Sequence, residues 1–149
     1  MADPGSRRLP PFSEHLATLT DVLHPNQLSL LHTAIGRLSG AERSFVPTHK
    51  KGGTIAYETL CRDAPEIVAL YLSPRLHALI SGIVGVPVMP TPLHDQSSCS
   101  VLVYERAGDH IGWHYDHNFY RDRHFTVLLP IINRDAAGGS LSAARLYVR

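Results

Sequence analysis

The sequence predicts an α+β fold, with helices in the first half of the chain and a sheet in the second. Apolar residues recur at spacings of three and four as far as Gly85, the pattern of one helix face. After Gly85, runs of β-branched and aromatic residues alternate with turn residues, the pattern of strands. We expect one domain over residues 12–149, with a helical support (12–85) and a β region (86–149), after a disordered N-terminus at residues 1–11.

The predicted helices follow from capping residues and apolar spacing. A first helix is expected over residues 12–23, and Pro25 begins a second that Gly40 ends. A third helix begins at Ala64-Pro65 and runs to Leu72, and Ser73-Pro74 begins a fourth that ends before Gly85. Residues 41–53 are polar and contain Pro and Gly-Gly, so we expect a mobile loop there, followed by a short extended piece at 54–57.

Five strands are expected, at residues 86–89, 97–105, 111–116, 125–132 and 141–148. In the second strand, Cys99, Val101 and Val103 share one face, which reads as core. The opposite face, which ends in Tyr104, mixes polar and apolar side chains as the lining of a site would. Pro130 cannot donate to a ladder, so the strand at 125–132 is expected at a sheet edge or bulge.

The charge and the composition do not indicate any particular class of binding partner. The formal net charge is +1, and the two cysteines lack the spacing of a zinc ribbon or a disulfide framework. No signal sequence or transmembrane segment is recognisable, so we expect an intracellular protein, cytoplasmic or nuclear, without a membrane partner. Nucleic acid has weak support from the basic residues after position 116, for which a solvated loop is the simpler interpretation.

The segment GWHYDHNFY, residues 112–120, suggests a metal site. Side chains two residues apart in an extended chain lie on the same face, so His114 and Asp116 can reach one ion. One imidazole and one carboxylate are two thirds of the facial triad that binds non-haem Fe(II). The sequence therefore makes His114 and Asp116 candidate catalytic residues and metal ligands.

The stretches SVLVYERAGDHIGWHYD (100–116) and RHFTVLLPIIN (123–133) resemble the 2-oxoglutarate- and Fe(II)-dependent dioxygenases of the prolyl 4-hydroxylase-like and AlkB-like group. The resemblance implies a double-stranded β-helix (jelly-roll) fold, with Fe(II) as cofactor and 2-oxoglutarate as cosubstrate. It also implies that His114 and Asp116 bind the iron and that Tyr104 hydrogen-bonds a 2-oxoglutarate carboxylate. Hydroxylation or demethylation of an unidentified substrate, with release of succinate and CO2, is the function it implies.

Part of that pattern is missing from this sequence. After Asp116 the only histidines are His117 and His124, both too close in sequence to be the distal iron ligand, and no basic residue follows such a histidine. With four or five strands instead of about eight, the barrel is expected to stay half open. A chain shortened at its C-terminus, and inactive for that reason, fits these absences.

Two alternatives remain open. The chain could be a non-catalytic protein of the same fold, in which an oligomer or a partner covers the open sheet edge. It could also hold a different metal site, such as that of a zinc hydrolase, with His94 or His124 as the third ligand.

Overall fold

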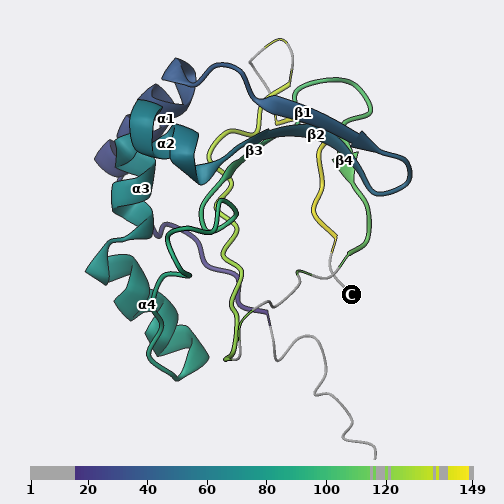
Figure 1. Ribbon diagram of the computed structural model, residues 1–149. Helices are drawn as coiled ribbons and strands as arrows, with labels where there is room; N and C mark the ends of the chain where they lie inside the picture. The colour runs from purple at the N-terminus through teal and green to yellow at the C-terminus, as the bar shows by residue number, and fades with distance from the viewer. Residues whose placement is uncertain are drawn as a thin grey trace, which may run out of the picture.

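The computed structural model describes residues 16–114, 116, 120, 122–135, 137 and 141–147. In these residues the helices are α1 (Pro25–Arg37), α2 (Tyr57–Asp63), α3 (Pro65–Tyr71) and α4 (Pro74–Val84). The strands are β1 (Glu42–Val46), β2 (Lys50–Ile55), β3 (Val101–Val103) and β4 (His110–Ile111). Figure 1 shows the helices stacked beside one end of the sheet.

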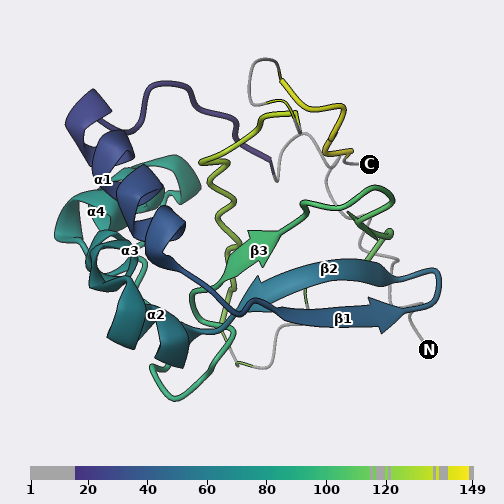
Figure 2. The same cartoon turned by 90° about the horizontal axis from the view of Figure 1, so that it is seen from above.

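The sheet is antiparallel and built around β2. Strand β1 pairs with one edge of β2 over its whole length, with Phe45 opposite Lys51. The other edge of β2 pairs with β3 near one end and with β4 near the other, so that Lys50 lies opposite Ile111. Figure 2 shows the β1–β2 hairpin projecting away from the helices. The strands described here form an open sheet.

The core lies where the helices meet the end of β2. Ala34, Leu60 and Ala64 have no exposed surface, and Ile55 at the end of β2 is 5% exposed. Cys99, Val101 and Val103 pack against this cluster, which confirms the predicted core face of the strand before Tyr104. Leu102 on the opposite face is 42% exposed. Burial of small and branched side chains at this junction therefore joins helices to sheet.

Three of the four predicted helices are confirmed. Helix α1 begins at Pro25, α3 at Pro65 and α4 at Pro74, as expected from proline at the first helical position. The Ser73 hydroxyl accepts a hydrogen bond from the Leu76 N–H, and Gly85 ends α4 in the left-handed conformation. The helix predicted at 12–23 is wrong over residues 16–23, which form no regular element, and residues 12–15 lie outside the described residues. Helix α2 was not predicted.

The loop predicted at residues 41–53 is wrong, because this segment forms most of the β1–β2 hairpin. Gly52 and Gly53, which suggested a loop, lie inside β2. Side chains of β3 and of Tyr104 occupy the space that a Cβ atom at these two positions would fill. A Cβ atom on Gly52 would lie 2.8 Å from the Tyr104 ring, and one on Gly53 would lie 3.3 Å from the Val103 Cβ. The glycines therefore allow β3 and its side chains to approach β2 closely.

The predicted strands after Gly85 are mostly wrong. The second survives, shortened to β3, and the third shares only Ile111 with β4, so His114 and Asp116 lie on no strand. Residues 86–89, 125–132 and 141–147 form no strand. Residue 148 lies outside the described residues. The segment at 125–132 instead runs past α1, where the Nε2–H of His32 donates to the Ile131 carbonyl at 2.9 Å. Pro130 supplies no N–H for a ladder, and Leu128 stays 56% exposed.

The α+β class is confirmed in its coarse form, as helices beside an open antiparallel sheet. The described residues form no second sheet, so the jelly roll is not confirmed. By length and composition one stretch, Pro65–Val84, passes as a candidate membrane span, which core helices of many proteins also do. Ser73-Pro74 divides that stretch into α3 and α4. An intracellular location stays a prediction, as do the domain limits.

Candidate functional site

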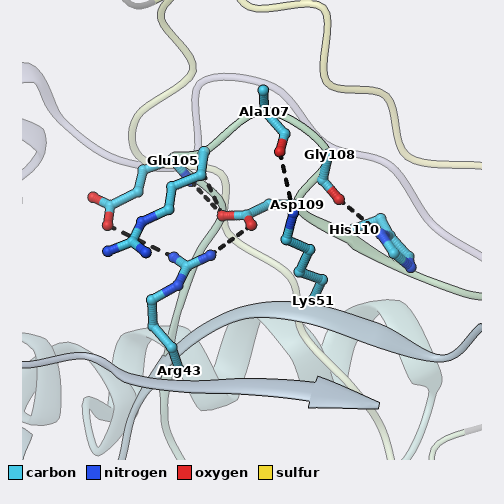
Figure 3. A network of polar contacts seen from close by, with 8 residues as sticks. Arg43, Lys51, Glu105, Ala107, Gly108, Asp109 and His110 are labelled. Carbon is cyan, nitrogen blue, oxygen red and sulfur yellow. Dashed lines mark hydrogen bonds and ion pairs between the residues drawn. The ribbon is translucent and has the colours of Figure 1, made fainter. Parts of the chain in front are cut away.

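A partly buried ion pair fixes the turn that leads to the GWHYD segment, residues 112–116. Asp109, whose side chain is 1% exposed, accepts a hydrogen bond from the Arg43 guanidinium at 2.5 Å. The same carboxylate accepts the backbone N–H groups of Glu105 (3.1 Å) and Arg106 (3.0 Å). Figure 3 shows Arg43 reaching up from β1 and Lys51 from β2 toward this turn. The turn between β3 and β4 is therefore held to the hairpin by charge-assisted hydrogen bonds.

The pKa of the Asp109 carboxyl is lowered by its contacts with Arg43 and with the backbone of the turn. Burial by itself raises the pKa, but the hydrogen bond and charge of Arg43, together with the N–H groups of Arg106 and Glu105, outweigh burial and lower it below the usual value. A carboxyl whose pKa falls on folding stabilises the fold above its unfolded pKa, about 3.9. That contribution is lost as the pH falls through the lower, folded-state pKa.

We therefore expect Asp109→Asn to lower the unfolding midpoint temperature at neutral pH, since Arg43 then loses its closer charged partner and keeps the contact with Glu105 at 3.7 Å. The difference from the wild type should narrow as the pH falls below about 4, because the wild-type Asp109 carboxylate then becomes protonated. Thermal unfolding measured from pH 7 to pH 2 checks this. Glu42→Gln, on the exposed start of β1, removes a carboxylate without removing a described ion pair and is the control. If the two unfolding midpoint temperatures still differ by the same amount at pH 2, the ionisation of Asp109 does not account for the difference in stability.

The GWHYD segment contacts the tip of the β1–β2 hairpin through its first residue, Gly112. The Gly112 N–H donates to the His49 carbonyl at 2.5 Å, just after Thr48, which has a positive φ of 62°. A Cβ atom on Gly112 would lie 2.6 Å from the Thr48 carbonyl oxygen. Position 112 thus requires glycine because the backbone of the hairpin turn occupies the space of a side chain.

His114 and Asp116 are brought together, as the sequence predicts. His114 Nε2 lies 3.4 Å from Asp116 Oδ1. The other ring nitrogen, Nδ1, lies 2.8 Å from the Gly112 carbonyl, to which its N–H donates. Such a contact from the second ring nitrogen orients histidines in metal sites and in proton-transfer pairs alike. The Asp116 Oδ2 accepts a hydrogen bond from the Thr126 hydroxyl at 2.6 Å.

The pair by itself fits two neighbouring positions on one ion. Two donor atoms each about 2.1 Å from a metal at a right angle are about 3 Å apart, close to the spacing of His114 Nε2 and Asp116 Oδ1. A third ligand is not in place, however. No group of three His, Cys, Asp or Glu side chains in the described part of the chain is arranged to hold a metal ion. These residues therefore supply part of a metal centre and not a whole one.

A further imidazole, that of His49, contacts this pair. Its ring meets the His114 ring edge-on, with 5.8 Å between the centroids. The other candidate ligands are placed elsewhere: the His124 ring contacts Tyr120, also at 5.8 Å between centroids, and His94 forms no described metal group with the pair. A zinc site completed by His94 or His124 is therefore wrong for the described residues. His117 and Arg121 lie outside them.

Tyr104 directly follows β3, on the sheet face opposite the core. Its ring covers Gly52 of β2, and the residue is 39% exposed. Burial, and then the negative charge of Asp109, raise the pKa of the phenol, so that it keeps its proton at neutral pH. Among the described residues the Tyr104 hydroxyl has no hydrogen-bond partner. Its predicted role in binding 2-oxoglutarate stays a prediction.

Sequence reasoning missed the contributions of the hairpin. His49 and Lys50 fall in the segment expected to be a mobile loop, so neither was considered for the site. The signal that could have found the hairpin is the alternation in ERSFV, followed by the turn-forming Pro47 and by Thr54 and Ile55. Thr126 was recognised as a neighbour of the site, but its contact with Asp116 was not expected.

Comparison with known protein families gives a match over most of the chain. A family model described as HalD, Halogenase D, matches residues 14–139, which include the hairpin, Tyr104 and the His114–Asp116 pair. Neither the curated proteins nor the solved structures contain a match to this chain.

This match corrects the assignment suggested by the sequence. The matched family is named for halogenation, and nothing in the comparisons supports a 2-oxoglutarate- and Fe(II)-dependent dioxygenase. The prediction of hydroxylation or demethylation by such an enzyme is therefore wrong. The resemblance rested on HxD and its flanking strands, a short pattern that does not discriminate between families.

Proposed function

Because the chain belongs to the halogenase D family, we propose that it halogenates a small substrate on the face of the molecule that carries His114 and Asp116. The family match, which spans both residues, carries this proposal. It is supported by the paired arrangement of the two side chains and by their exposure, since both are open to solvent. The reaction replaces a C–H bond of the substrate with a carbon–halogen bond.

The chemistry defines what the site must provide. When a halide ion replaces hydrogen on carbon, one proton and two electrons leave the reactants, so an oxidant of the dioxygen class must accept the electrons. Fe(II) as cofactor and 2-oxoglutarate as cosubstrate stay predictions, and bound Fe(II) would supply the redox chemistry that dioxygen needs. His114 and Asp116 would then hold the ion, with Thr126 orienting Asp116 and the Gly112 carbonyl orienting His114.

We expect purified protein to form halogenated products from a mixed metabolite extract supplied with bromide, Fe(II), 2-oxoglutarate and air. Mass spectrometry detects these products by the paired isotope pattern of bromine. His114→Ala should lower product formation at least about 100-fold if the pair organises the reacting centre. Omission of Fe(II) and of 2-oxoglutarate in separate reactions tests each as a cofactor.

His110→Ala is a matched control. Like His114, His110 is exposed and its Nδ1 lies close to the carbonyl two residues earlier, at 2.9 Å from Gly108 O. Among the described residues no carboxylate forms an ion pair with it, unlike His114 with Asp116, so its loss should leave product formation within about twofold. Equal losses in the two variants, or no brominated product from the wild type, would contradict the proposal. The second result would favour the non-catalytic alternative.

A partner or a second copy on the free edge of the sheet is a separate proposal. Strand β1 pairs only with β2 in the described part of the chain, and Phe45 on it is 67% exposed. Unpaired edge strands with exposed apolar side chains invite pairing with another chain. Light scattering across protein concentrations would show whether the chain self-associates.

A further inference from the structure

We propose that His49, at the tip of the β1–β2 hairpin, is a positioning residue for His114, and that its ring holds the His114 imidazole in the orientation that faces Asp116. This inference rests on the proposed function, since it concerns the same pair of side chains. It gives the His49 ring neither a ligand role nor a proton-transfer role.

The His114 imidazole has a polar contact at each ring nitrogen. Its Nδ1–H donates to the Gly112 carbonyl at 2.8 Å, and its Nε2 lies 3.4 Å from Asp116 Oδ1. These contacts set the directions of the two nitrogen atoms, but the ring plane can still tilt about the line that joins them. Histidine side chains also have a broad χ2 torsion, so rotamer preference does not fix the tilt. A contact against the ring itself is needed to do so.

The His49 ring supplies a contact of this kind. Its centroid lies 5.8 Å from that of the His114 ring, and the two planes make an angle of 86°, so the edge of one ring meets the face of the other. Edge-to-face packing at centroid distances of about 4.5–7 Å is a favourable arrangement of aromatic rings. A tilt of the His114 ring would change this angle and weaken the contact, so the contact opposes the tilt.

The backbone on both sides of His49 is fixed. The His49 N–H donates to the Val46 carbonyl at 3.0 Å, which closes the turn at the end of β1. The next residue, Lys50, begins β2 and lies opposite Val46 on one edge and Ile111 on the other. The ring of His49 is therefore presented from a backbone that turn and strand pairing hold in place, as the positioning of another side chain requires.

His49 also holds the backbone that carries His114. Its carbonyl accepts the Gly112 N–H at 2.5 Å, and the Gly112 carbonyl is the acceptor for His114 Nδ1–H. The main chain of His49 therefore places the residue that orients His114, while its side chain contacts the imidazole directly. A substitution at position 49 removes the ring and keeps the carbonyl, so the contribution of the ring can be measured separately.

The order parameter of the His114 Cε1–H bond, obtained from 13C relaxation of histidine-labelled, metal-free protein, measures the motion of this ring directly. On the usual scale about 0.85 is rigid and below about 0.6 is flexible. Wild type should be in the rigid range, and His49→Ala should fall to the flexible range. His49→Phe, which keeps an aromatic ring, should return to the rigid range. A flexible His114 ring in the wild type, or a rigid one in His49→Ala, would overturn the proposal.

His110→Ala is the matched control, because it removes an exposed imidazole from β4, the strand that precedes His114. Its Nδ1 lies 2.9 Å from the Gly108 carbonyl, and its ring packs against no aromatic ring among the described residues. The order parameter of His114 should therefore stay as in the wild type. An equal fall in His110→Ala and His49→Ala would indicate a general loosening of the sheet and would overturn the proposal. If His49→Ala does not fold, His49→Gln, which also lacks a ring, takes its place.

The bromination assay separates positioning from other roles of His49. His49→Ala should lower product formation about 2- to 10-fold, the range for one edge-to-face contact, and His49→Phe should restore it to within about twofold of wild type. Phenylalanine has no nitrogen with which to bind a metal or carry a proton. A His49→Phe protein with an ordered His114 ring but the low activity of His49→Ala would therefore overturn the proposal. Unchanged product formation in His49→Ala would do the same.

Failure of the proposed function gives a different result. If the wild type forms no brominated product while the order parameters follow the expected pattern, the proposed function fails and the positioning of His114 by His49 stands. If the wild type is active and its His114 ring is equally ordered in His49→Ala, the inference about His49 alone is wrong.

Discussion

Leu60→Ala is expected to lower the free energy of unfolding by about 2–5 kcal/mol, the usual cost of emptying a fully buried leucine site. Leu60 of α2 has no exposed surface and belongs to the cluster with Ala34, Ile55 and Ala64. Those neighbours are small or lie on separate elements, so they cannot fill the space that the leucine leaves. Urea unfolding followed by circular dichroism measures the change.

Leu30→Ala is its matched control. Leu30 lies on α1 and is 59% exposed, so the same substitution removes the same atoms from a solvated position. We expect a change within about 0.5 kcal/mol, as for other surface substitutions. Similar losses at the two positions would show that the helix-to-sheet junction is not the main core.

Gly112→Ala is expected to cost about 1–3 kcal/mol and to remove activity together with stability. The new Cβ atom would lie 2.6 Å from the Thr48 carbonyl oxygen, a backbone atom that cannot turn aside. The GWHYD segment or the hairpin tip must therefore move, and the hydrogen bond from the Gly112 N–H to the His49 carbonyl lengthens. Because His114 follows two residues later, the His114–Asp116 pair should be displaced. Urea unfolding and the bromination assay measure the two effects.

Gly82→Ala is the control for this substitution. Gly82 lies inside α4 and has no atom within 4 Å of an added Cβ. Alanine there should stabilise the helix by about 0.5–1 kcal/mol and leave activity unchanged. An active Gly112→Ala protein of wild-type stability would contradict the seating of the GWHYD segment on the hairpin.

Local signals in the sequence were sufficient for part of the fold. Proline at the first helical position and Ser73 or Gly85 at a helix end depend only on neighbouring residues, so α1, α3 and α4 were predicted with nearly correct bounds. The alternation at residues 99–103 likewise identified the core face of β3. Strands that need a distant partner were not predictable in this way, since the apolar run at 125–132 found none among the described residues.

The protein family and the composition of the site were also predicted only in part from the sequence. The HxD spacing correctly predicted that His114 and Asp116 would lie together, but the dioxygenase assignment built on it was wrong once the halogenase D match was known. Two side chains on three successive residues specify a local arrangement. They do not specify the rest of a site, which comes from other parts of the chain.

The sequence by itself determined the α+β class, three helices, the core face of β3 and the pairing of His114 with Asp116, because each depends on residues within a few positions of one another. Only the tertiary structure decided that Gly52 and Gly53 belong to a strand and that His49 contacts His114. It also decided that Lys50 lies beside Thr54 on the face covered by Tyr104. Those positions depend on the register between β2 and strands some fifty residues away, which long-range packing sets and local propensity does not.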